Sequence, residues 1–372
     1  MIDFSLTNDQ LLMKRSILDA VSKIKMESPF IEQWKQVAAT GIIATCVDQR
    51  YGGSGLGAVD MLVLLEALSE GIQDSGLSFA IAAHTLSCVI PISEYGNDHL
   101  KEKLLPGLIN GTMIAANAMT ESESGSDVFT MHCKATKEGN KYRLNGTKTF
   151  ISNASTSSIV LTYASSDAEK GFFGGLTSFI VEQGNYRLGS EFKKMGLDSC
   201  SLGEIIFDGC LVDESSVLGK VGGGGIIFNH SMEWERICLA GVHLGAMRRV
   251  LGKTINYVNE RKSGGMGIGK YQGVSHQLAE MKLLLETATN TALKAAWSLD
   301  NKKDVSIEAA MCKLYVSNAV REFMLKAMQV FGGYGYVKDY GIESEVRNAL
   351  AGTIYSGTSE IQKNVIASHL DI

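Results

Sequence analysis

The sequence predicts an α+β protein in three consecutive parts, with helices at both ends and a small β domain between them. Residues 1–115 contain apolar segments rich in helix formers, such as Asp60–Leu68 and Leu77–Ile90. Residues 116–223 carry short β-branched or aromatic runs, which are typical of strands. From residue 224 to residue 372 the helical period returns. The chain has only 3 prolines in 372 residues, which favours long, uninterrupted elements.

The strands predicted in the middle part are short. Lys141–Leu144 alternates polar and apolar side chains and runs into Asn145-Gly146, a dipeptide typical of a hairpin turn. Further strands are predicted at Ser158–Tyr163, Thr177–Val181 and Glu204–Phe207. Together these runs predict a small β domain.

Two helices of the C-terminal part are predicted from their apolar spacing. Apolar side chains recur three, four or seven residues apart, as one face of a helix requires, in Phe228, Met232, Leu239, Val242, Ala246 and Val250, and again in Val316, Val320, Phe323, Ala327 and Val330. The glycine clusters Gly222–Gly225 and Gly264–Gly269 match neither dinucleotide-binding nor phosphate-binding loops. We therefore expect both clusters to be flexible connections.

Composition excludes several classes of function. The net charge is -5 and no dense Lys/Arg block occurs, so nucleic acid is not an expected partner. The seven cysteines are scattered and never spaced as CxxC, which predicts reduced thiols and no metal site. The first residues lack the apolar core of a signal peptide, and no stretch approaches the roughly 18 apolar residues of a membrane span. The sequence predicts a cytoplasmic protein.

Five segments in the same order along the chain resemble the acyl-CoA dehydrogenase family. They are Met119–Asp127, similar to "TEPxAGSD"; Asn145–Asn153, similar to "NGxKxWITN"; Glu260–Met281, similar to "ERxxFGxxixxxQ…LAEM"; Gln329–Tyr336, similar to "QxxGGxGY"; and Ile354–Gln362, similar to "IYEGTSEIQ". Any one match is weak, but five in family order make the resemblance specific. The helix, β domain and helix layout agrees with it.

This resemblance implies an N-terminal helical domain, a β-barrel-like middle domain and a C-terminal four-helix bundle, with FAD held between the last two. It places cofactor contacts at Met119, Thr120, Gly125, Ser126, Phe150, Ser152, Gln329, Gly333, Thr358 and Glu360. Phe150 stands in place of the usual tryptophan over the flavin, and Ser152 keeps the hydroxyl expected near flavin N5. Arg261, Ser263 and Gln272 match positions that reach the FAD of a neighbouring subunit, which implies a homo-oligomer, most simply a dimer of dimers. Gly264 replaces a phenylalanine that usually lies beside the cofactor.

The resemblance also identifies a catalytic base. Ser356 occupies the position where many family members carry the catalytic glutamate, and an unassisted hydroxyl is a poor base near neutral pH. Glu235 matches the helical position at which the isovaleryl and long-chain branches place that glutamate, directly before an arginine. The backbone N–H of Ser356 would still polarise the thioester carbonyl. Further substrate-pocket residues implied are Arg236, Ser126, Tyr355 and Gly357.

The expected activity is FAD-dependent oxidation of an acyl thioester at its α,β-carbons. Coenzyme A and an acyl carrier protein both remain open as the thioester carrier. One alternative is oxidation of an amino- or hydroxy-substituted acyl group on a carrier protein in natural-product biosynthesis. A second alternative is a flavin-binding or assembly protein that has lost catalysis. The electron acceptor, such as an electron-transfer flavoprotein or O₂, is not specified by the sequence.

Overall fold

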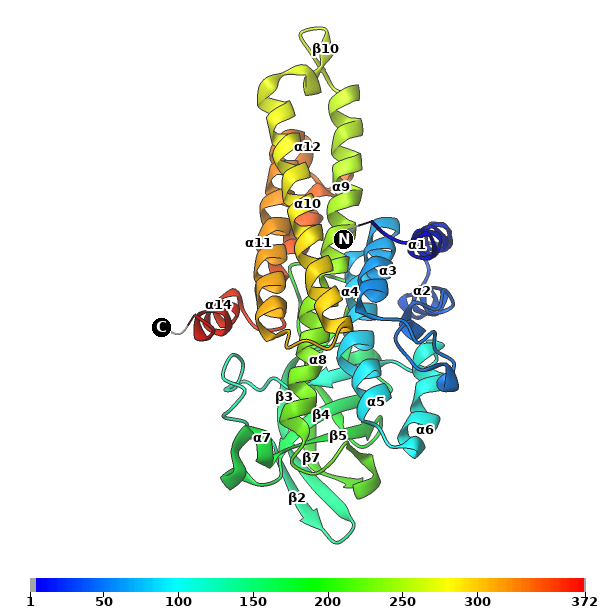
Figure 1. The fold of residues 1–372 in the computed structure, drawn as a ribbon, viewed down its shortest axis with the longest axis vertical. Helices are drawn as coiled ribbons and strands as arrows, with labels where there is room; N and C mark the ends of the chain where they lie inside the picture. Colours follow the sequence, from blue (N-terminus) through cyan, green and yellow to red (C-terminus); the bar gives the residue numbers. More distant parts are fainter. Residues whose placement is uncertain (1–4, 371–372) are drawn as a thin grey trace.

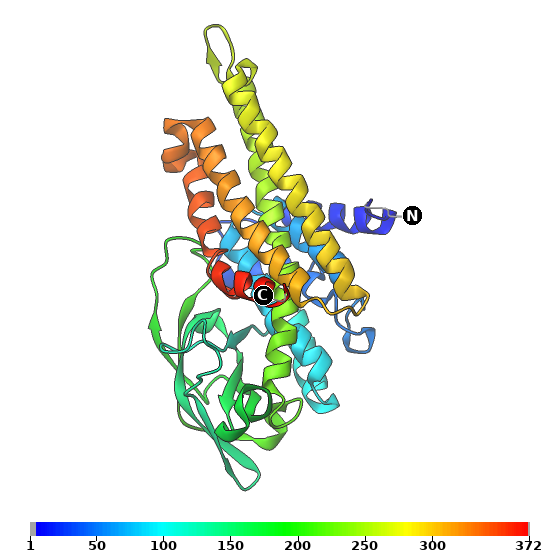
Figure 2. The same cartoon turned by 60° about the vertical axis from the view of Figure 1, so that its left-hand side comes forward.

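The computed structural model describes residues 5–370 and confirms the three-part α+β architecture (Figure 1). The β domain lies at one end of a long helical bundle, and the N-terminal helices pack along the side of the bundle (Figures 1 and 2). One large hydrophobic core joins the N-terminal helices to the bundle, and a second core fills the β domain. All seven cysteines are free.

The N-terminal domain consists of six α-helices and short 3₁₀ turns. The helices are α1 (Asn8–Val21), α2 (Phe30–Ala38), α3 (Ala58–Gly71), α4 (Ser75–His84), α5 (Ile90–Tyr95) and α6 (Asp98–Ile109), with 3₁₀ turns at Ile42–Ala44 and Gln49–Tyr51. Helix α1 begins with a reciprocal capping box, in which Gln10 N donates to Thr7 Oγ1 (3.2 Å) and Thr7 N donates to Gln10 Oε1 (3.0 Å). The Asp74 carboxylate caps α4 by accepting from Gly76 N at 2.8 Å.

Helices α4 and α5 are joined by a π-helical segment, Thr85–Val89, into one continuous helix from Ser75 to Tyr95. Its length and composition would suffice to cross a membrane, so the expectation that no stretch is long and apolar enough is wrong. Its apolar window is completely buried inside the protein, and it forms the centre of the large core. The π-helical segment also places Ser87 at the wall of the active-site cavity described below.

The middle domain is one curved sheet of eight strands. Its hydrogen-bonded order is β6-β7-β3-β2-β4-β5-β8, and β1 pairs in parallel with β4. The strands are β1 (Ala115–Ala118), β2 (Lys134–Glu138), β3 (Lys141–Ser152), β4 (Ile159–Ser165), β5 (Leu176–Glu182), β6 (Arg187–Glu191), β7 (Leu202–Asp213) and β8 (Val217–Leu218). A short helix, α7 (Gly171–Gly175), precedes β5. The strands predicted around residues 158, 177 and 204 are therefore confirmed.

The hairpin turn predicted at Asn145-Gly146 is wrong, because β3 runs through this dipeptide without turning. The β2–β3 hairpin turns earlier, at Gly139-Asn140, where Gly139 has a φ of 62°. Gly146 instead lies at a β-bulge, because the register of β3 against β7 shifts between Leu144 and Gly146. A Cβ on Gly146 would lie 2.8 Å from the Cα of Cys133, so close packing of two backbones explains this glycine.

The C-terminal bundle is built from four long helices. These are α8 (Gly224–Cys238), α9 (Ala240–Glu260), α10 (Gln272–Asp300) and α11 (Ser306–Phe331), followed by α12 (Gly333–Tyr336), α13 (Ile342–Ala351) and α14 (Ser359–Ser368). The two helices predicted from apolar spacing correspond to α8–α9 and α11. Helix α9 packs closely on α3, because a Cβ on Gly245 would lie only 2.2 Å from Glu66 O.

The two glycine clusters take part in regular elements of the fold. Gly224 and Gly225 begin α8, where added Cβ atoms would lie 2.8 Å from Leu176 O and 2.6 Å from Phe172 O. This close approach fixes the start of α8 against the β domain. In the second cluster, Gly264 and Gly265 form the turn of a two-stranded hairpin, β9 (Lys262–Ser263) and β10 (Met266–Gly267), at the far end of the bundle (Figure 2).

Candidate active site

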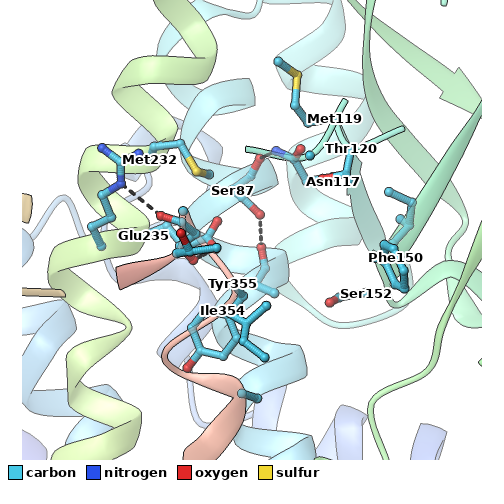
Figure 3. A pocket seen from close by; sticks show the side chains of 18 of the residues that line it. Ser87, Asn117, Met119, Thr120, Phe150, Ser152, Met232, Glu235, Ile354 and Tyr355 are labelled. Atoms are coloured by element: carbon cyan, nitrogen blue, oxygen red, sulfur yellow. Dashed lines mark hydrogen bonds between the residues drawn. The ribbon is translucent and has the colours of Figure 1, made fainter. Parts of the chain in front are cut away.

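A cavity of about 1060 Å³ lies where the β domain, the N-terminal helices and the bundle meet. Its walls come from β1, β3, α8, the π-helical segment, and the loops around residues 120, 196 and 355. Figure 3 shows Glu235 and Met232 on one side and Phe150 and Ser152 on the opposite side. Ligand sites of drug-sized molecules occupy roughly 300–1,000 Å³, so this space is large enough for a ring system together with a short acyl group.

Glu235 is the carboxylate at the inner wall of the cavity. It projects from α8, and the Ser356 hydroxyl donates a hydrogen bond to its Oε1. Burial raises the pKa of Glu235, while the Ser356 hydrogen bond and the charges of Arg236 and Lys313 partly oppose that rise. A carboxylate with a raised pKa, held beside a cavity, has the properties of a general base that works near neutral pH.

The loop that carries Ser356 is tied to α8 and α14. Arg236 Nε donates to Ser356 O at 3.1 Å, and Gln362 Nε2 donates to the same oxygen at 3.2 Å and to Gly357 O at 3.0 Å. The backbone of Ser356 has a φ of 54°, and Gly357 follows with a φ of 87°. These hydrogen bonds hold the backbone of Ser356 in place. The Ser356 side chain is thereby positioned so that its hydroxyl can donate to Glu235.

Tyr355 completes the inner wall. Its hydroxyl is 2.7 Å from His243 Nε2, and its ring lies 4.8 Å from that of Phe79, centroid to centroid. Burial lowers the pKa of His243 to about 4, so this histidine is neutral at physiological pH. The predicted pocket residues Arg236, Ser126, Tyr355 and Gly357 all line the cavity.

A buried ion pair holds the loop that begins at Met119. Lys148, which is 0% exposed, donates to Glu121 Oε1 at 2.8 Å and to Met119 O at 3.0 Å. The Glu121 carboxylate also accepts from the backbone N–H groups of His132 and Cys133, at 2.7 and 2.9 Å. Burial alone would raise the pKa of Glu121, but Lys148 and the backbone donors outweigh it and hold that pKa below its ordinary value. The ion pair and these hydrogen bonds therefore hold the loop that begins at Met119 in place.

Backbone strain is concentrated at this cavity. Among residues 5–370, five non-glycine residues have a positive φ, and four of them line the cavity: Phe150, Asn153, Leu197 and Ser356. Such conformations cost on the order of 1–3 kcal/mol each and persist where the surroundings enforce them. At Phe150 the strained backbone interrupts the register of β3 and leaves the ring 59% exposed, stacked on Phe192 at 5.0 Å.

The residues predicted to contact the cofactor fall into two groups. Met119, Thr120, Gly125, Ser126, Phe150, Ser152 and Thr358 line the cavity. Arg261, Ser263, Gln272, Gln329 and Gly333 are exposed near the end of the bundle away from the β domain (Figures 1 and 2). Arg261 lies 5.5 Å from the ring centroid of Tyr334, which connects its hairpin to α12. Glu360 is also exposed, on α14, beside Lys363.

Sequence reasoning missed several residues of the cavity, among them Ser87, Asn117 and Met232. Asn117 Nδ2 donates to Ser87 O at 2.8 Å and ties β1 to the π-helical segment. A π-helical segment inside an apolar helix leaves no signal in the pattern of apolar residues. Glu233, two residues before Glu235 on α8, also lines the cavity.

The cavity suits a flavin. Phe150 presents an aromatic face, Thr120 and Ser152 present hydroxyl groups, and Gly125 leaves open space beside its Cα. An aromatic cover with hydroxyl and backbone donors at the edge matches the polar rim of an isoalloxazine ring. With Glu235 across from this surface, the fold and site define a flavin-dependent dehydrogenase.

Comparison with known proteins agrees with this class. Family models described as the acyl-CoA dehydrogenase N-terminal, middle and C-terminal domains match residues 11–112, 116–210 and 222–370. The chain belongs to the acyl-CoA dehydrogenase family of FAD-dependent oxidoreductases.

One sequence relative and two solved structures, whose names refer to prolyl groups or proline, are similar to this chain over nearly its whole length. The L-prolyl-[peptidyl-carrier protein] dehydrogenase of Serratia sp. (strain ATCC 39006) is 36% identical over 382 residues, covering 100% of this chain and 99% of the relative. The solved structure of PigA with FAD and proline superposes with a TM-score of 0.94 at 36% identity, covering 100% and 99% of the two chains. That of the prolyl acyl carrier protein oxidase AnaB gives 0.95 at 35%, covering 99% and 100%.

We predict that Lys148→Met destabilises the protein by about 3–5 kcal/mol, because the substitution leaves Glu121 as an unpaired buried charge. Urea unfolding followed by circular dichroism measures the change. The matched control is Lys137→Met on the neighbouring strand β2, which breaks an exposed ion pair with Glu214 and a contact of the ammonium group over the Tyr142 ring. That control should cost no more than about 1 kcal/mol. Equal, small effects of both variants would contradict the role assigned to the buried pair.

Proposed function

We propose that this protein uses FAD to oxidise a prolyl group, or a closely related cyclic aminoacyl group, held as a thioester on a carrier protein. The observation that supports this proposal most is the position of Glu235, which projects from α8 into the cavity. Ser356 occupies the loop position where many family members carry the catalytic glutamate. Full-length similarity to prolyl carrier-protein dehydrogenases supports the choice of substrate.

The geometry assigns a role to each group around the substrate. Glu235 takes the proton from the α-carbon, since it is the carboxylate that Ser356 holds at the inner wall. Among residues 5–370, the Ser356 N–H meets no hydrogen-bond acceptor, so it is free to polarise the thioester carbonyl. Phe150 and Ser152, on the wall opposite Glu235, would hold FAD, which would supply the hydride acceptor when bound (Figure 3). Glu235 on one wall and the cofactor on the other would leave the acyl group between them.

The polarity of the inner wall favours an amino-substituted acyl group. Hydroxyl groups of Ser87 and Ser356 lie among apolar side chains of Phe79, Ala83, Met232 and Ile354. A ring nitrogen next to the α-carbon would find oxygen acceptors near Glu235, while the ring methylenes contact the apolar wall. A plain short acyl chain makes no use of those oxygens, whose lone pairs can still accept a hydrogen bond from a ring N–H.

Flavin reduction under anaerobic conditions tests this proposal. The panel contains a prolyl group on a carrier protein, the same group on coenzyme A, and butyryl- and isovaleryl-coenzyme A. We expect rapid bleaching with prolyl-carrier protein and at least a tenfold slower reaction with each coenzyme A thioester. Faster reduction by butyryl-coenzyme A would contradict the substrate assignment. A yellow protein that no thioester bleaches would identify it as a flavin-binding protein without this catalysis.

We further propose a cytoplasmic homo-oligomer without a membrane span, most simply a dimer of dimers. The exposed group around Arg261 supports the oligomer, because it lies away from its own cavity and is available to a second copy's cofactor. The seven free cysteines are consistent with a reducing compartment.

The electron acceptor is an electron-transfer flavoprotein or O₂. Comparing the rates at which each of them reoxidises the reduced protein decides between the two.

We predict that Arg261→Ala weakens retention of FAD. Losing one charge-assisted contact to the pyrophosphate is worth on the order of 1.5–3 kcal/mol, or roughly a 10- to 150-fold rise in Kd. Recovery of FAD fluorescence on dilution measures release. Arg50→Ala is the control, because it removes an exposed arginine of the N-terminal domain that pairs with Glu102. Equal FAD release from both variants would show that Arg261 is only a surface charge.

A further inference from the structure

Lys313 is a buried cation to which neither the sequence nor the proposed mechanism assigns a role. It belongs to α11, is 5% exposed, and its Nζ has no hydrogen-bond partner among residues 5–370. An ammonium group removed from water without a partner is costly, so a nearby negative charge or a water molecule must compensate it. Its surroundings show which groups are available.

A second, much smaller cavity lies behind the inner wall of the active site. Its volume is about 10 Å³, close to the minimum that holds one water molecule. It connects α8, α9, α11 and the Ser356 loop, and its polar lining is Glu235, Arg236, His243, Lys313, Ser317 and Ser356. Lys313 and Glu235 therefore line the same small space.

Charged and titratable groups face Lys313 from α8, α9, α14 and the Ser356 loop, where Tyr355 lines the same cavity. From α8, Arg236 repels it and Glu235 attracts it, while Glu360 attracts it from α14. From α9, His243 is neutral, and its Nε2 is engaged with the Tyr355 hydroxyl. Burial and Arg236 lower the pKa of Lys313 to about 8, so the side chain still carries its charge at neutral pH.

Arg236 and Lys313 both favour the ionised form of Glu235, and the effect of Arg236 is the larger. The Nε of Arg236 donates to the carbonyl of Ser356, whereas Lys313 Nζ donates to no group among residues 5–370. One water molecule in the small cavity would accept a hydrogen bond from Lys313 Nζ and donate one to the Glu235 carboxylate, and so join the two groups. The attraction opposes the desolvation of Glu235 that burial imposes.

We propose that Lys313 is a positioning residue that keeps Glu235 ionised, acting from behind the active site across a water-sized space. The inference rests on the proposed function in one respect, the assignment of Glu235 as the base. Lys313 itself touches neither the substrate nor the cofactor, since it does not line the large cavity.

The test measures protonation of Glu235 directly and then its consequence for catalysis. The variants are Lys313→Met and Lys313→Gln, which remove the charge, and Lys313→Arg, which keeps it. Lys326→Met is the matched control, because it removes a lysine of the same helix that pairs with Glu280 at the surface. The infrared C=O band of the protonated carboxyl, assigned by its loss in Glu235→Gln, is titrated with pH in FAD-loaded protein without substrate.

Loss of the positive charge should raise the midpoint of this band by roughly one pH unit. In Lys313→Met and Lys313→Gln the acid limb of the flavin-reduction rate should move by the same amount, so the rate below the midpoint falls about tenfold. Lys313→Arg and Lys326→Met should leave both midpoints unchanged. If the methionine variant does not fold, the glutamine variant decides.

An unchanged infrared midpoint in the charge-removing variants, or an equal shift in Lys313→Arg, would overturn the inference. The infrared readout does not depend on turnover. A band that shifts while the rate profile stays fixed would therefore support the electrostatic coupling and contradict the assignment of Glu235 as the base. A rate profile that shifts with the band supports both.

Discussion

The contact between the Glu235 carboxylate and the Ser356 hydroxyl is the interaction on which the active site depends. It joins two segments 121 residues apart in sequence and closes the inner wall of the cavity. For this contact to form, the loop must adopt a positive φ at Ser356, and Arg236 and Gln362 must hold its carbonyl. With Glu235 on helix α8 as the proposed base, the loop is free to supply a hydroxyl and a backbone donor.

The remainder of the fold positions that contact. Glycines at the start of α8 allow its backbone to lie against the β domain, which sets where Glu235 enters the cavity. On the opposite wall, the Lys148–Glu121 pair fixes the loop around Thr120, and the strained backbone of Phe150 turns its ring outward. The substrate and cofactor therefore meet between two surfaces that are each anchored by buried polar contacts. If Lys313 acts as inferred, a third buried charge supports the base from behind.

Much of this could be predicted from the sequence, for identifiable reasons. Helices α8–α9 and α11 follow from apolar spacing, and the motifs around Thr120, Phe150 and Ser356 place those residues at one cavity. The turn predicted at Asn145-Gly146 was wrong because the dipeptide that favours a turn also fits a bulge where Cys133 approaches closely. In Gly222–Gly225, likewise, Gly224 and Gly225 allow two backbones to approach closely at the start of α8. Ser87, Asn117 and Lys313 could not be found, because their roles arise from distant segments that meet only in the folded chain.

The rate of flavin reduction in Glu235→Gln, measured by stopped flow against Ser356→Ala and the unmodified protein, tests the central claim most directly. Glutamine keeps the shape of the side chain and removes its basicity. The account predicts that the rate falls by at least roughly 10²–10⁴-fold in Glu235→Gln, with FAD and ligand binding retained. Ser356→Ala loses a hydrogen bond to the base but keeps the base and the backbone donor, so its loss should be at least tenfold smaller. A near-normal rate in Glu235→Gln together with an inactive Ser356→Ala would contradict the account.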